Sequence, residues 1–600
     1  MTTAAPVTTS RDGRVALREA GLREGIRRVA AHPGGQAALV MALALLVRVF
    51  VIVRAHGMLD GDEAVLGIQA EQILRGARPA YFAGQAYMGT WDAYLAAPLI
   101  ALFGPSAALI HAITAAESLL LIPVMGALAG RLLGARARLP AMALSALPPL
   151  YVTVGELRML GGYVETLVIG SALMLIAVVL RDRMRSGASL GRLSPLAGLL
   201  VGLGLWIDQL VVYYILACAL WLLPTAIACL RREVAGDRAR VVTRFGQATA
   251  LFIGTAVIGA SPALIYALSH HGANVAFVTH SGGNASGPSL QLETLRYYLT
   301  VASPRVLGIS WIWQPLSEHA LFVYALRLAT LLVSALALGY LCLRALAPAM
   351  SRRLIGGSAA PETPNQRGRD AFALVLLATI SLVFWRTAQN GGLSLYALVD
   401  AAGRYALPLN TVMTLAFARL IADLPAIMRG RPRRVGTWAA QVLLIATLLV
   451  NAVPYALTSG VEAMQSGYFH GNTFPAQDGS VLGYLKRQHI RYIWTDHWFG
   501  TVVTYLEDGQ VVYADYVDAT QRHGHMRFPQ FYALVAGADR PSFLIESDPV
   551  LGEPAVASAL DALHVTYTMA RFGRICVITP ISRTVQPSEI VQALVEDYGQ

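Results

Sequence analysis

The chain has 600 residues, of which 55% are hydrophobic and only 14% are charged, and its mean hydropathy is +0.52. This composition excludes a water-soluble enzyme and predicts an integral membrane protein. The formal net charge of +11 does not point to nucleic acid, because the basic residues form clusters that alternate with apolar segments.

Apolar runs long enough to cross a bilayer recur through the first three quarters of the chain, and they predict about eleven transmembrane helices. The first run follows a basic segment, residues 1–35. It is no signal peptide, because it lies too far into the chain and lacks a small-residue cleavage site. The predicted helices span 36–55, 105–130, 139–155, 163–180, 193–207, 210–230, 247–268, 319–344, 371–387, 405–424 and 437–458.

Arginine clusters assign the two sides of the membrane. The positive-inside rule places the clusters in the cytoplasm, together with the N-terminus. With an odd number of helices, the C-terminal tail is then predicted to lie outside. The clusters lie before residue 30 and at 131–138, 181–192, 231–244, 344–369 and 429–434.

Three predicted outward loops are long: 56–104, 269–318 and 388–404. Loops that merely connect helices are short, so long loops are candidates for function. In the loop 269–318, Gly282 and Gly283 permit movement and the nearby tryptophans suit an interface, which favours a lid over a site. A tolerated surface insertion is the alternative for this loop.

Asp60, Asp62 and Glu63 lie together just after the first apolar run. Clustered acids are costly beside hydrocarbon and crossing a membrane does not require them, so they predict chemistry at the outer surface. A helix is predicted over 62–76, with an acid-rich first turn and an apolar stripe suited to lying on the membrane. Asp60 is the better candidate for the N-cap of this helix, and Asp62 for a catalytic base.

The segment 84–95 reads GQAYMGTWDAYL. Tyr87, Trp91 and Tyr94 are interfacial aromatics, which either anchor the loop in the headgroups or stack on a sugar. Anchoring is the commoner role of such residues. Asp92 is either a second acid of the site or the cap of the next helix.

The sequence Asp62-Glu63-Ala64, the helix behind it and the stretch Gly-Gln-x-Tyr-Met-Gly at 84–89 resemble the membrane-embedded C-type glycosyltransferases (GT-C). The closest branch is that of the protein mannosyltransferases and aminoarabinose transferases. The layout is similar over 36–424, but the specific motif is confined to 60–95. The resemblance implies a GT-C fold in the bacterial inner (plasma) membrane and transfer of a sugar from a polyprenyl-phosphate donor, with inversion, to an acceptor on the outer face.

By this resemblance, Asp62 matches the acid that activates the acceptor, with Glu63 beside it as a second catalytic residue. A sugar hydroxyl is a poor nucleophile, so a carboxylate base suits the chemistry. The departing lipid phosphate needs cationic donors, and those should be the rare outward arginines. The predicted substrate-binding residues are Asp60, Gln85, Tyr87, Asp92, Arg158, Tyr163, Arg404 and Tyr405.

Several of these polar residues have a second interpretation. Arg404 is either a phosphate ligand or a snorkelling anchor. Arg158 either belongs to the site or pairs with Glu156. Glu117 and Glu165 are expected to be structural partners of a buried arginine or tyrosine, not catalysts.

After residue 459 the hydropathy falls, which predicts a transmembrane GT-C-like domain over 36–459 and a small soluble α/β domain over 460–600. This second domain would bind the acceptor or a partner. His497, His523 and His525 offer no complete metal site, because no third ligand accompanies the last two. Helices are predicted at 480–488 and 555–563, and strands at 490–494, 510–513, 542–546, 565–570 and 575–579.

No cofactor is required by the sequence. The clustered carboxylates could ligate Mg²⁺ or Mn²⁺, but their number alone does not demand a metal. The expected partners are the polyprenyl-phosphate sugar, membrane lipid and an acceptor that is a glycan, a lipid or a protein. The alternative function is a polytopic transporter or lipid flippase, against which no internal repeat is visible.

Overall fold

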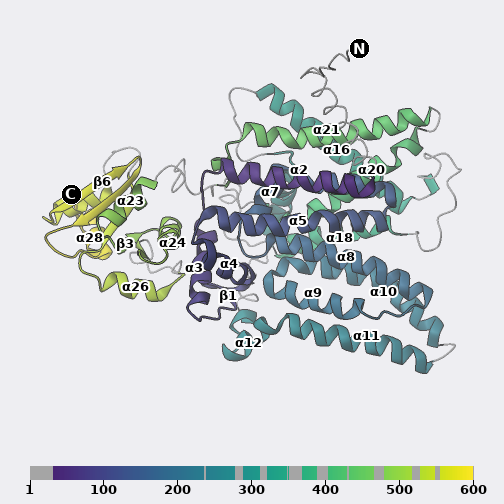
Figure 1. Cartoon of the computed structure of the whole chain (residues 1–600), viewed down its shortest axis with the longest axis horizontal. Helices are drawn as coiled ribbons and strands as arrows, with labels where there is room; N and C mark the ends of the chain where they lie inside the picture. The colour runs from purple at the N-terminus through teal and green to yellow at the C-terminus, as the bar shows by residue number, and fades with distance from the viewer. Residues whose placement is uncertain are drawn as a thin grey trace, which may run out of the picture.

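The computed structural model describes most of the chain outside its two ends and several internal segments (Figure 1). The described residues are 32–234, 238–276, 288–310, 320–347, 349–350, 368–387, 403–428, 432–464, 479–516, 527–547 and 554–598.

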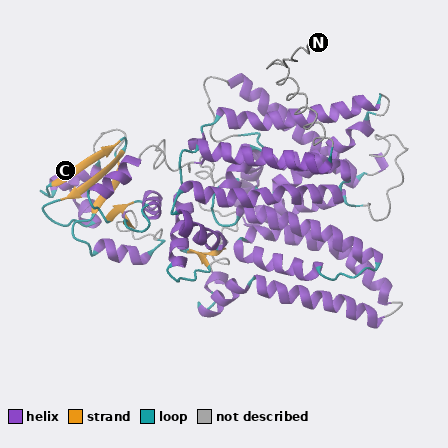
Figure 2. Cartoon of the chain, viewed as in Figure 1, coloured by secondary structure: helices purple, strands orange, loops and turns teal. Residues whose placement is uncertain are grey.

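Among the described residues, seven helices are long and apolar enough to cross a membrane, and one bent pair would make an eighth span. Figures 1 and 2 show these helices side by side in one bundle. The prediction of a polytopic helical membrane protein is confirmed. The seven are α2 (Pro33–Arg54), α5 (Ala107–Leu132), α8 (Tyr163–Ser186), α10 (Val212–Val234), α16 (Ala320–Leu346), α20 (Leu409–Ile427) and α21 (Arg433–Leu457); the pair, bent by 62°, is α11 (Arg238–Gly259) with α12 (Ser261–Ser269). Shorter apolar helices are α4 (Trp91–Phe103), α9 (Leu193–Ile207) and α18 (Asp370–Thr387).

The structure differs from the prediction at 139–155, which is not one helix. It is divided into α6 (Arg138–Ala146) and α7 (Leu150–Leu157), with Pro148 and Pro149 between them. Proline lacks an amide hydrogen and disfavours helical backbone in the residue before it, so the helix ends at this point. Each of the other predicted runs overlaps one of the helices named above.

The core of the bundle draws on six of these helices, α16 among them. Its largest buried cluster joins Leu128 of α5, Leu167 of α8, Tyr214 of α10, Leu376 of α18 and Leu415 of α20. The ends of these helices, and the short helices between them, therefore have a packed base on which a polar site can be held in place. The shorter described helices are α14 (Pro288–Tyr297), α15 (Ser303–Val306) and α22 (Gly460–Met464), with single turns η1 (Ala135–Ala137), η2 (Gln209–Val211), η3 (Tyr298–Ala302) and η4 (Arg404–Ala406).

The first outward loop contains a helix, a hairpin and the entry to α4. The helix is α3 (Gly61–Leu74), and the hairpin pairs β1 (Tyr81–Phe82) with β2 (Gln85–Gly89) in antiparallel register. The prediction that α3 lies on the membrane surface is wrong, because residues 63–71 are buried on every face of the helix. One side of α3 packs against α4, and another packs against a helix of the C-terminal domain.

The C-terminal domain is a five-stranded sheet with helices, and the predicted small α/β fold is confirmed. The strand order is β4-β3-β5-β7-β6, with β3 parallel to β4 and β5, and β7 antiparallel to β5 and β6. Every predicted element overlaps an observed one, but three helices were not predicted: α24 (His497–Leu506), α26 (Pro529–Ala536) and α28 (Pro587–Tyr598). The others are α23 (Gly479–Arg487), α27 (Ala555–Ala562), β3 (Tyr492–Thr495), β4 (Val512–Asp515), β5 (Ser542–Glu546), β6 (Tyr567–Phe572) and β7 (Ile575–Pro580).

A shared hydrophobic core joins this domain to the first outward loop. Leu66 of α3 and Ile110 of α5 belong to the same buried cluster as Val502 and Tyr505 of α24. The approach is close, since a Cβ at Gly61 would lie 2.9 Å from the backbone Cα of Trp498. Figure 1 shows α24 beside α3 at the end of the bundle. The C-terminal domain is therefore packed directly onto the predicted catalytic loop.

Two of the predicted long loops are described only in part. In the loop 269–318 the described residues include α14 and α15, while Gly282 and Gly283 lie outside the described residues. The same holds for residues 388–402 of the third loop, and for His523 and His525 in the C-terminal domain.

Candidate active site

The start of α3 is fixed by a capping box, as its acid-rich first turn suggests. Asp60 is the N-cap: its Oδ1 accepts a hydrogen bond from the Asp62 amide at 2.9 Å. The Glu63 Oε2 accepts one in return from the Asp60 amide at 3.0 Å. This reciprocal pattern satisfies amide groups that the first turn of a helix leaves unpaired. Two of the three clustered acids thus hold the helix terminus in place.

Glu63 is also tied to the helical bundle. Its Oε1 accepts a hydrogen bond from the Met159 amide at 3.0 Å and lies 3.2 Å from His111 Nε2. The Glu63 side chain is fully buried. Burial alone would raise its pKa, but His111 and Arg158 outweigh burial and lower it. With both oxygens engaged inside the protein, Glu63 is placed to position α3 and not to touch a substrate.

Arg158 pairs with the N-cap of α3. Its Nη2 lies 2.6 Å from Asp60 Oδ2, and both side chains are buried. The alternative pairing with Glu156 does not form, because Glu156 makes its ion pair with Arg48 of α2. Arg158 therefore anchors the helix that carries Asp62.

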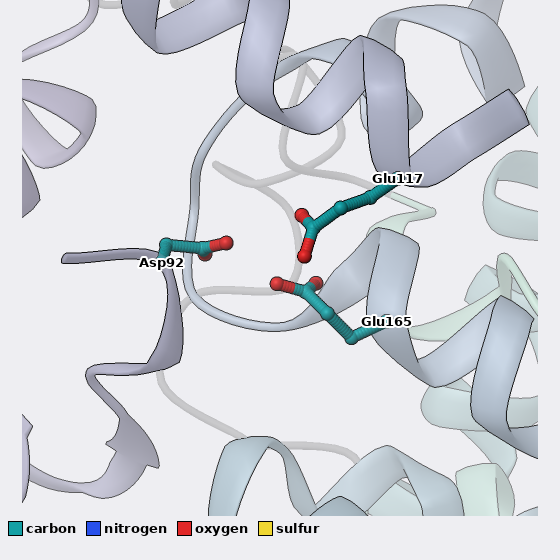
Figure 3. Close-up of side chains that lie close together, drawn as sticks. All are labelled: Asp92, Glu117 and Glu165. Atoms are coloured by element: carbon teal, nitrogen blue, oxygen red, sulfur yellow. The ribbon is translucent and has the colours of Figure 1, made fainter. Parts of the chain in front are cut away.

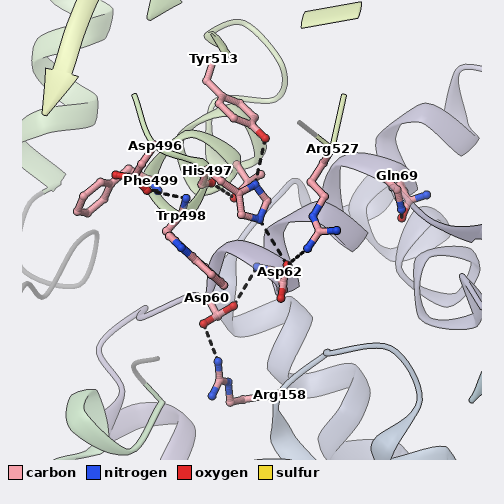
Figure 4. A network of polar contacts seen from close by, with 12 residues as sticks. Asp60, Asp62, Gln69, Arg158, Asp496, His497, Trp498, Phe499, Tyr513 and Arg527 are labelled. Atoms are coloured by element: carbon pink, nitrogen blue, oxygen red, sulfur yellow. Dashed lines mark hydrogen bonds and ion pairs between the residues drawn. The ribbon is translucent and has the colours of Figure 1, made fainter. Parts of the chain in front are cut away.

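Asp62 remains at the surface of this arrangement. Its side chain is 22% exposed, and its Oδ1 lies 3.4 Å from His497 Nε2 and 3.3 Å from Arg527 Nη2 (Figure 4). Burial opposes its ionisation, but His497, Arg527 and Arg404 together lower the pKa of Asp62 to about 2. The carboxylate is therefore ionised at neutral pH and surrounded by cationic groups.

Arg527 joins the C-terminal domain to the hairpin of the first loop. With the Gln85 amide oriented to satisfy both groups, its oxygen accepts hydrogen bonds from Arg527 Nη1 at 2.9 Å and Nη2 at 3.0 Å. The guanidinium also lies over the Phe82 ring, 5.2 Å from its centroid. Gln85, one of the predicted site residues, is thus brought to Asp62 through Arg527.

The second predicted cation, Arg404, approaches from the bundle. It donates a hydrogen bond to the Tyr405 hydroxyl at 3.1 Å, and it interacts electrostatically with Asp62, Tyr87 and Tyr163. Gly403 precedes it with φ +107°, a backbone conformation that favours glycine. The structure therefore brings the predicted residues Tyr87, Tyr163, Arg404 and Tyr405 to one place beside Asp62.

Asp92 does not join this group. It is not a cap either, because the N-cap of α4 is Thr90. Its carboxylate lies with those of Glu117 and Glu165, so the expectation that these two glutamates pair with an arginine or tyrosine is wrong (Figure 3). This is the one group of three such ligands within the described part of the chain. By contrast, the cations around Asp62 make that carboxylate poorly suited to hold a metal ion.

Two residues that contact Asp62 were not predicted to belong to its site: His497, which the sequence analysis considered only as a metal ligand, and Arg527. Asp496 caps α24 and places His497 in its first turn, directly after the parallel strand β3. The carboxyl end of a parallel strand is where functional side chains gather, and this position was the available signal. For Arg527, which follows residues outside the described part of the chain, no such signal exists in the sequence.

Comparisons with known proteins found solved structures that are similar to this chain at low sequence identity. No protein-family model and no curated protein matches. ArnT from Cupriavidus metallidurans bound to undecaprenyl phosphate is similar over 92% of this chain and 99% of its own, with 13% identity and a TM-score of 0.48. The archaeal oligosaccharyltransferase AglB from Archaeoglobus fulgidus, in complex with an inhibitory peptide and a dolichol-phosphate, is similar over 85% of this chain and 69% of its own, with 14% identity and a TM-score of 0.45.

Proposed function

We propose that the chain is an integral-membrane glycosyltransferase that moves a sugar from a polyprenyl-phosphate donor to an acceptor outside the cytoplasm, with Asp62 as general base. The observation that carries this proposal is the environment of Asp62. Of the three acids at the start of α3 it alone keeps an accessible side chain, whereas Asp60 and Glu63 are buried and paired. It also lies between cations from two parts of the chain.

The charge pattern supports the orientation in the membrane. α8 begins at Tyr163, within electrostatic reach of Arg404, and its last turn carries Arg183 and Arg185. The site and an arginine cluster therefore lie at opposite ends of one helix. With the cluster in the cytoplasm, the site and the domain 460–600 face outward.

In the proposed reaction, Asp62 accepts a proton from the acceptor, and two arginines stabilise the departing phosphate. The acceptor hydroxyl donates a hydrogen bond to the Asp62 carboxylate, and its oxygen attacks the anomeric carbon from the face opposite the phosphate. The hydroxyl proton passes to Asp62 as the new C–O bond forms. The bond between the anomeric carbon and the phosphate oxygen breaks, the electron pair leaves with the phosphate, and the configuration inverts. Arg404 and Arg527 stabilise the charge that develops on that phosphate.

The low pKa of Asp62 fits this sequence of events. A carboxylate with a pKa of about 2 is a weak base while Arg527 and His497 hold it. A donor phosphate that draws Arg527 toward itself would relieve the carboxylate of one cation and raise its basicity. The base would then become effective when the donor is bound.

The test compares purified wild type with Asp62→Asn on radiolabelled polyprenyl-phosphate sugars. We expect at least a hundredfold loss of sugar release in the variant, the size typical of a lost general base. Glu71→Gln is the matched control, because Glu71 is another acid of the same helix and is buried away from the site. We expect it to retain activity.

Three results would overturn the proposal. Unchanged sugar release in Asp62→Asn would remove Asp62 as the base. A product that retains the anomeric configuration would exclude direct displacement. Passage of a solute across proteoliposomes, with no lipid-linked sugar consumed under any condition, would favour a transporter.

A further inference from the structure

Three carboxylates meet in the helical bundle outside the site of Asp62. Asp92 lies in the first turn of α4, Glu117 in α5 and Glu165 in the first turn of α8. One oxygen from each lies within 4.8 Å of the other two. Figure 3 shows the three side chains pointing toward one another from different elements.

Four of the six carboxylate oxygens of this cluster have no hydrogen-bond donor among the described residues. Asp92 is 1% exposed and Glu165 is 5% exposed. Within the described residues, no hydrogen-bond partner reaches Asp92 Oδ1, Glu117 Oε2 or either oxygen of Glu165. The Trp91 indole donates one hydrogen bond, to Glu117 Oε1 at 3.0 Å. Buried carboxylates normally have several such partners, so these oxygens point to a missing positive group.

No side-chain cation of the described residues supplies that charge. None of the ion pairs found within the described residues includes Asp92, Glu117 or Glu165. The electrostatic interactions of Asp92, Glu117 and Glu165 are with one another. Three like charges this close repel strongly in a medium of low polarity, so a cation or shared protons must neutralise them.

We propose that Asp92, Glu117 and Glu165 bind one divalent cation of the hard type, Mg²⁺, Mn²⁺ or Ca²⁺. Such ions take carboxylate oxygens at about 2.0–2.6 Å, so ligands on opposite sides of one ion are separated by about 4–5 Å. The spacing of the cluster, at most 4.8 Å between ligand oxygens, is therefore compatible with one shared ion. The absence of cysteine and histidine from this group of ligands disfavours zinc.

The position of the cluster indicates a structural role for the ion. It would join α4 to α5 and α8, and α4 follows directly on β2, which carries Gln85 and Tyr87. A cation here would fix the hairpin of the first loop relative to the bundle without touching the reacting atoms. The inference rests on the cluster alone and holds whether or not the chain transfers sugars.

Direct metal binding tests it on the full-length protein in detergent. After removal of cations with EDTA and addition of MnCl₂, we expect one Mn²⁺ per chain by elemental analysis. We also expect a higher Tm with Mn²⁺ than without it. The variant Asp92→Asn/Glu117→Gln/Glu165→Gln should lose both effects, while Glu71→Gln, a buried acid outside the cluster, should keep them.

A second measurement needs no variant. If the cation displaces protons, Mn²⁺ affinity of the wild type falls by up to tenfold for each proton taken up as the pH is lowered by one unit. The infrared band of protonated carboxylic acids should then weaken when Mn²⁺ is added. The proposal is overturned if the wild type binds no more Mn²⁺, Mg²⁺ or Ca²⁺ than the triple variant. An infrared band unchanged by all three ions would instead assign shared protons to the cluster.

Discussion

Replacing Gly67 with alanine tests how the C-terminal domain is seated on α3. A Cβ at this position would lie 2.6 Å from two ring carbons of Tyr505, whereas carbon atoms in contact are separated by about 3.5–4.0 Å. Tyr505 has no room to turn away. It is fully buried, and its hydroxyl bonds both to the Ser106 amide at 3.1 Å and to the Ser106 carbonyl at 3.3 Å. We therefore expect Gly67→Ala to displace α24 by about 1 Å.

The effect on the site should exceed the effect on stability. Overpacking costs about 1–3 kcal/mol, while alanine in place of glycine within a helix gains about 1 kcal/mol, so the net loss is about 0–2 kcal/mol. The contact between His497 Nε2 and Asp62 Oδ1 is already 3.4 Å long. A further displacement of about 1 Å would break it, since hydrogen bonds weaken steeply beyond about 3.5 Å. Sugar transfer should fall sharply while Tm falls by a few degrees.

The assay measures Tm in detergent and sugar transfer side by side. Gly483→Ala in α23 is the control, because its Cβ would meet only the end of the flexible Arg487 side chain, at 3.2 Å. It should leave transfer unchanged and raise stability by up to about 1 kcal/mol. Tyr505→Leu, combined with Gly67→Ala, should cost less than the sum of the two single changes. If Gly67→Ala instead behaves like Gly483→Ala in both measurements, the reasoning about this interface is refuted.

Other charged residues give three more tests. Arg527→Gln removes a cation from Asp62, so the pKa of Asp62 should rise from about 2 toward its ordinary 3.8. The acidic limb of the pH–rate profile should then shift to higher pH. An acidic limb at the same pH as in the wild type contradicts this. Burial raises the pKa of Glu71 to about 8, so the contribution of this group to stability is complete below pH 4.5 and is lost as the pH rises through 8. The Tm of the wild type should therefore fall over this pH range, and Glu71→Gln should remove that fall. A parallel fall in both proteins would count against the argument. Asp60→Asn keeps an N-cap but removes the buried counter-charge of Arg158, so thermal unfolding should report a loss of about 3–5 kcal/mol in the free energy of unfolding. A Tm equal to that of the wild type would show that the ion pair does not contribute to stability.

The sequence was sufficient to locate the apolar helices because their signal is local, although only seven of the described helices, or eight spans with the bent pair, and not eleven, are long and apolar enough to cross a membrane. Length and hydropathy alone locate the apolar helices, and the run at 139–155, which is divided into α6 and α7, contains the two prolines that break it. The start of α3 was equally accessible, since Asp60 and Glu63 form a capping box within four residues. Features whose cause lies within one or two turns of chain could be predicted.

The surroundings of α3 could not be predicted, because the residues that cover this helix are distant in the sequence. The apolar stripe of α3 suggested a membrane surface, but the covering layer is α24, which lies more than 400 residues further along the chain. A stripe of apolar residues indicates that one face of a helix is buried, but it does not indicate whether lipid or another part of the protein covers that face. The same distance hid the contacts of His497 and Arg527 with Asp62, separated by 435 and 465 residues.

Under the proposed function, a site built in this way makes the C-terminal domain part of the chemistry. Arg404 acts on Asp62 electrostatically from the bundle, and Arg527, from the domain beyond residue 460, lies 3.3 Å from its carboxylate. Because one arginine cannot pair fully with both a carboxylate and a donor phosphate, binding of the donor must weaken the hold of Arg527 on Asp62. The carboxylate then gains basicity in the step in which the phosphate gains its counter-charge. Any change that loosens the domain from α3 should therefore raise the pKa of Asp62 and weaken the phosphate site together.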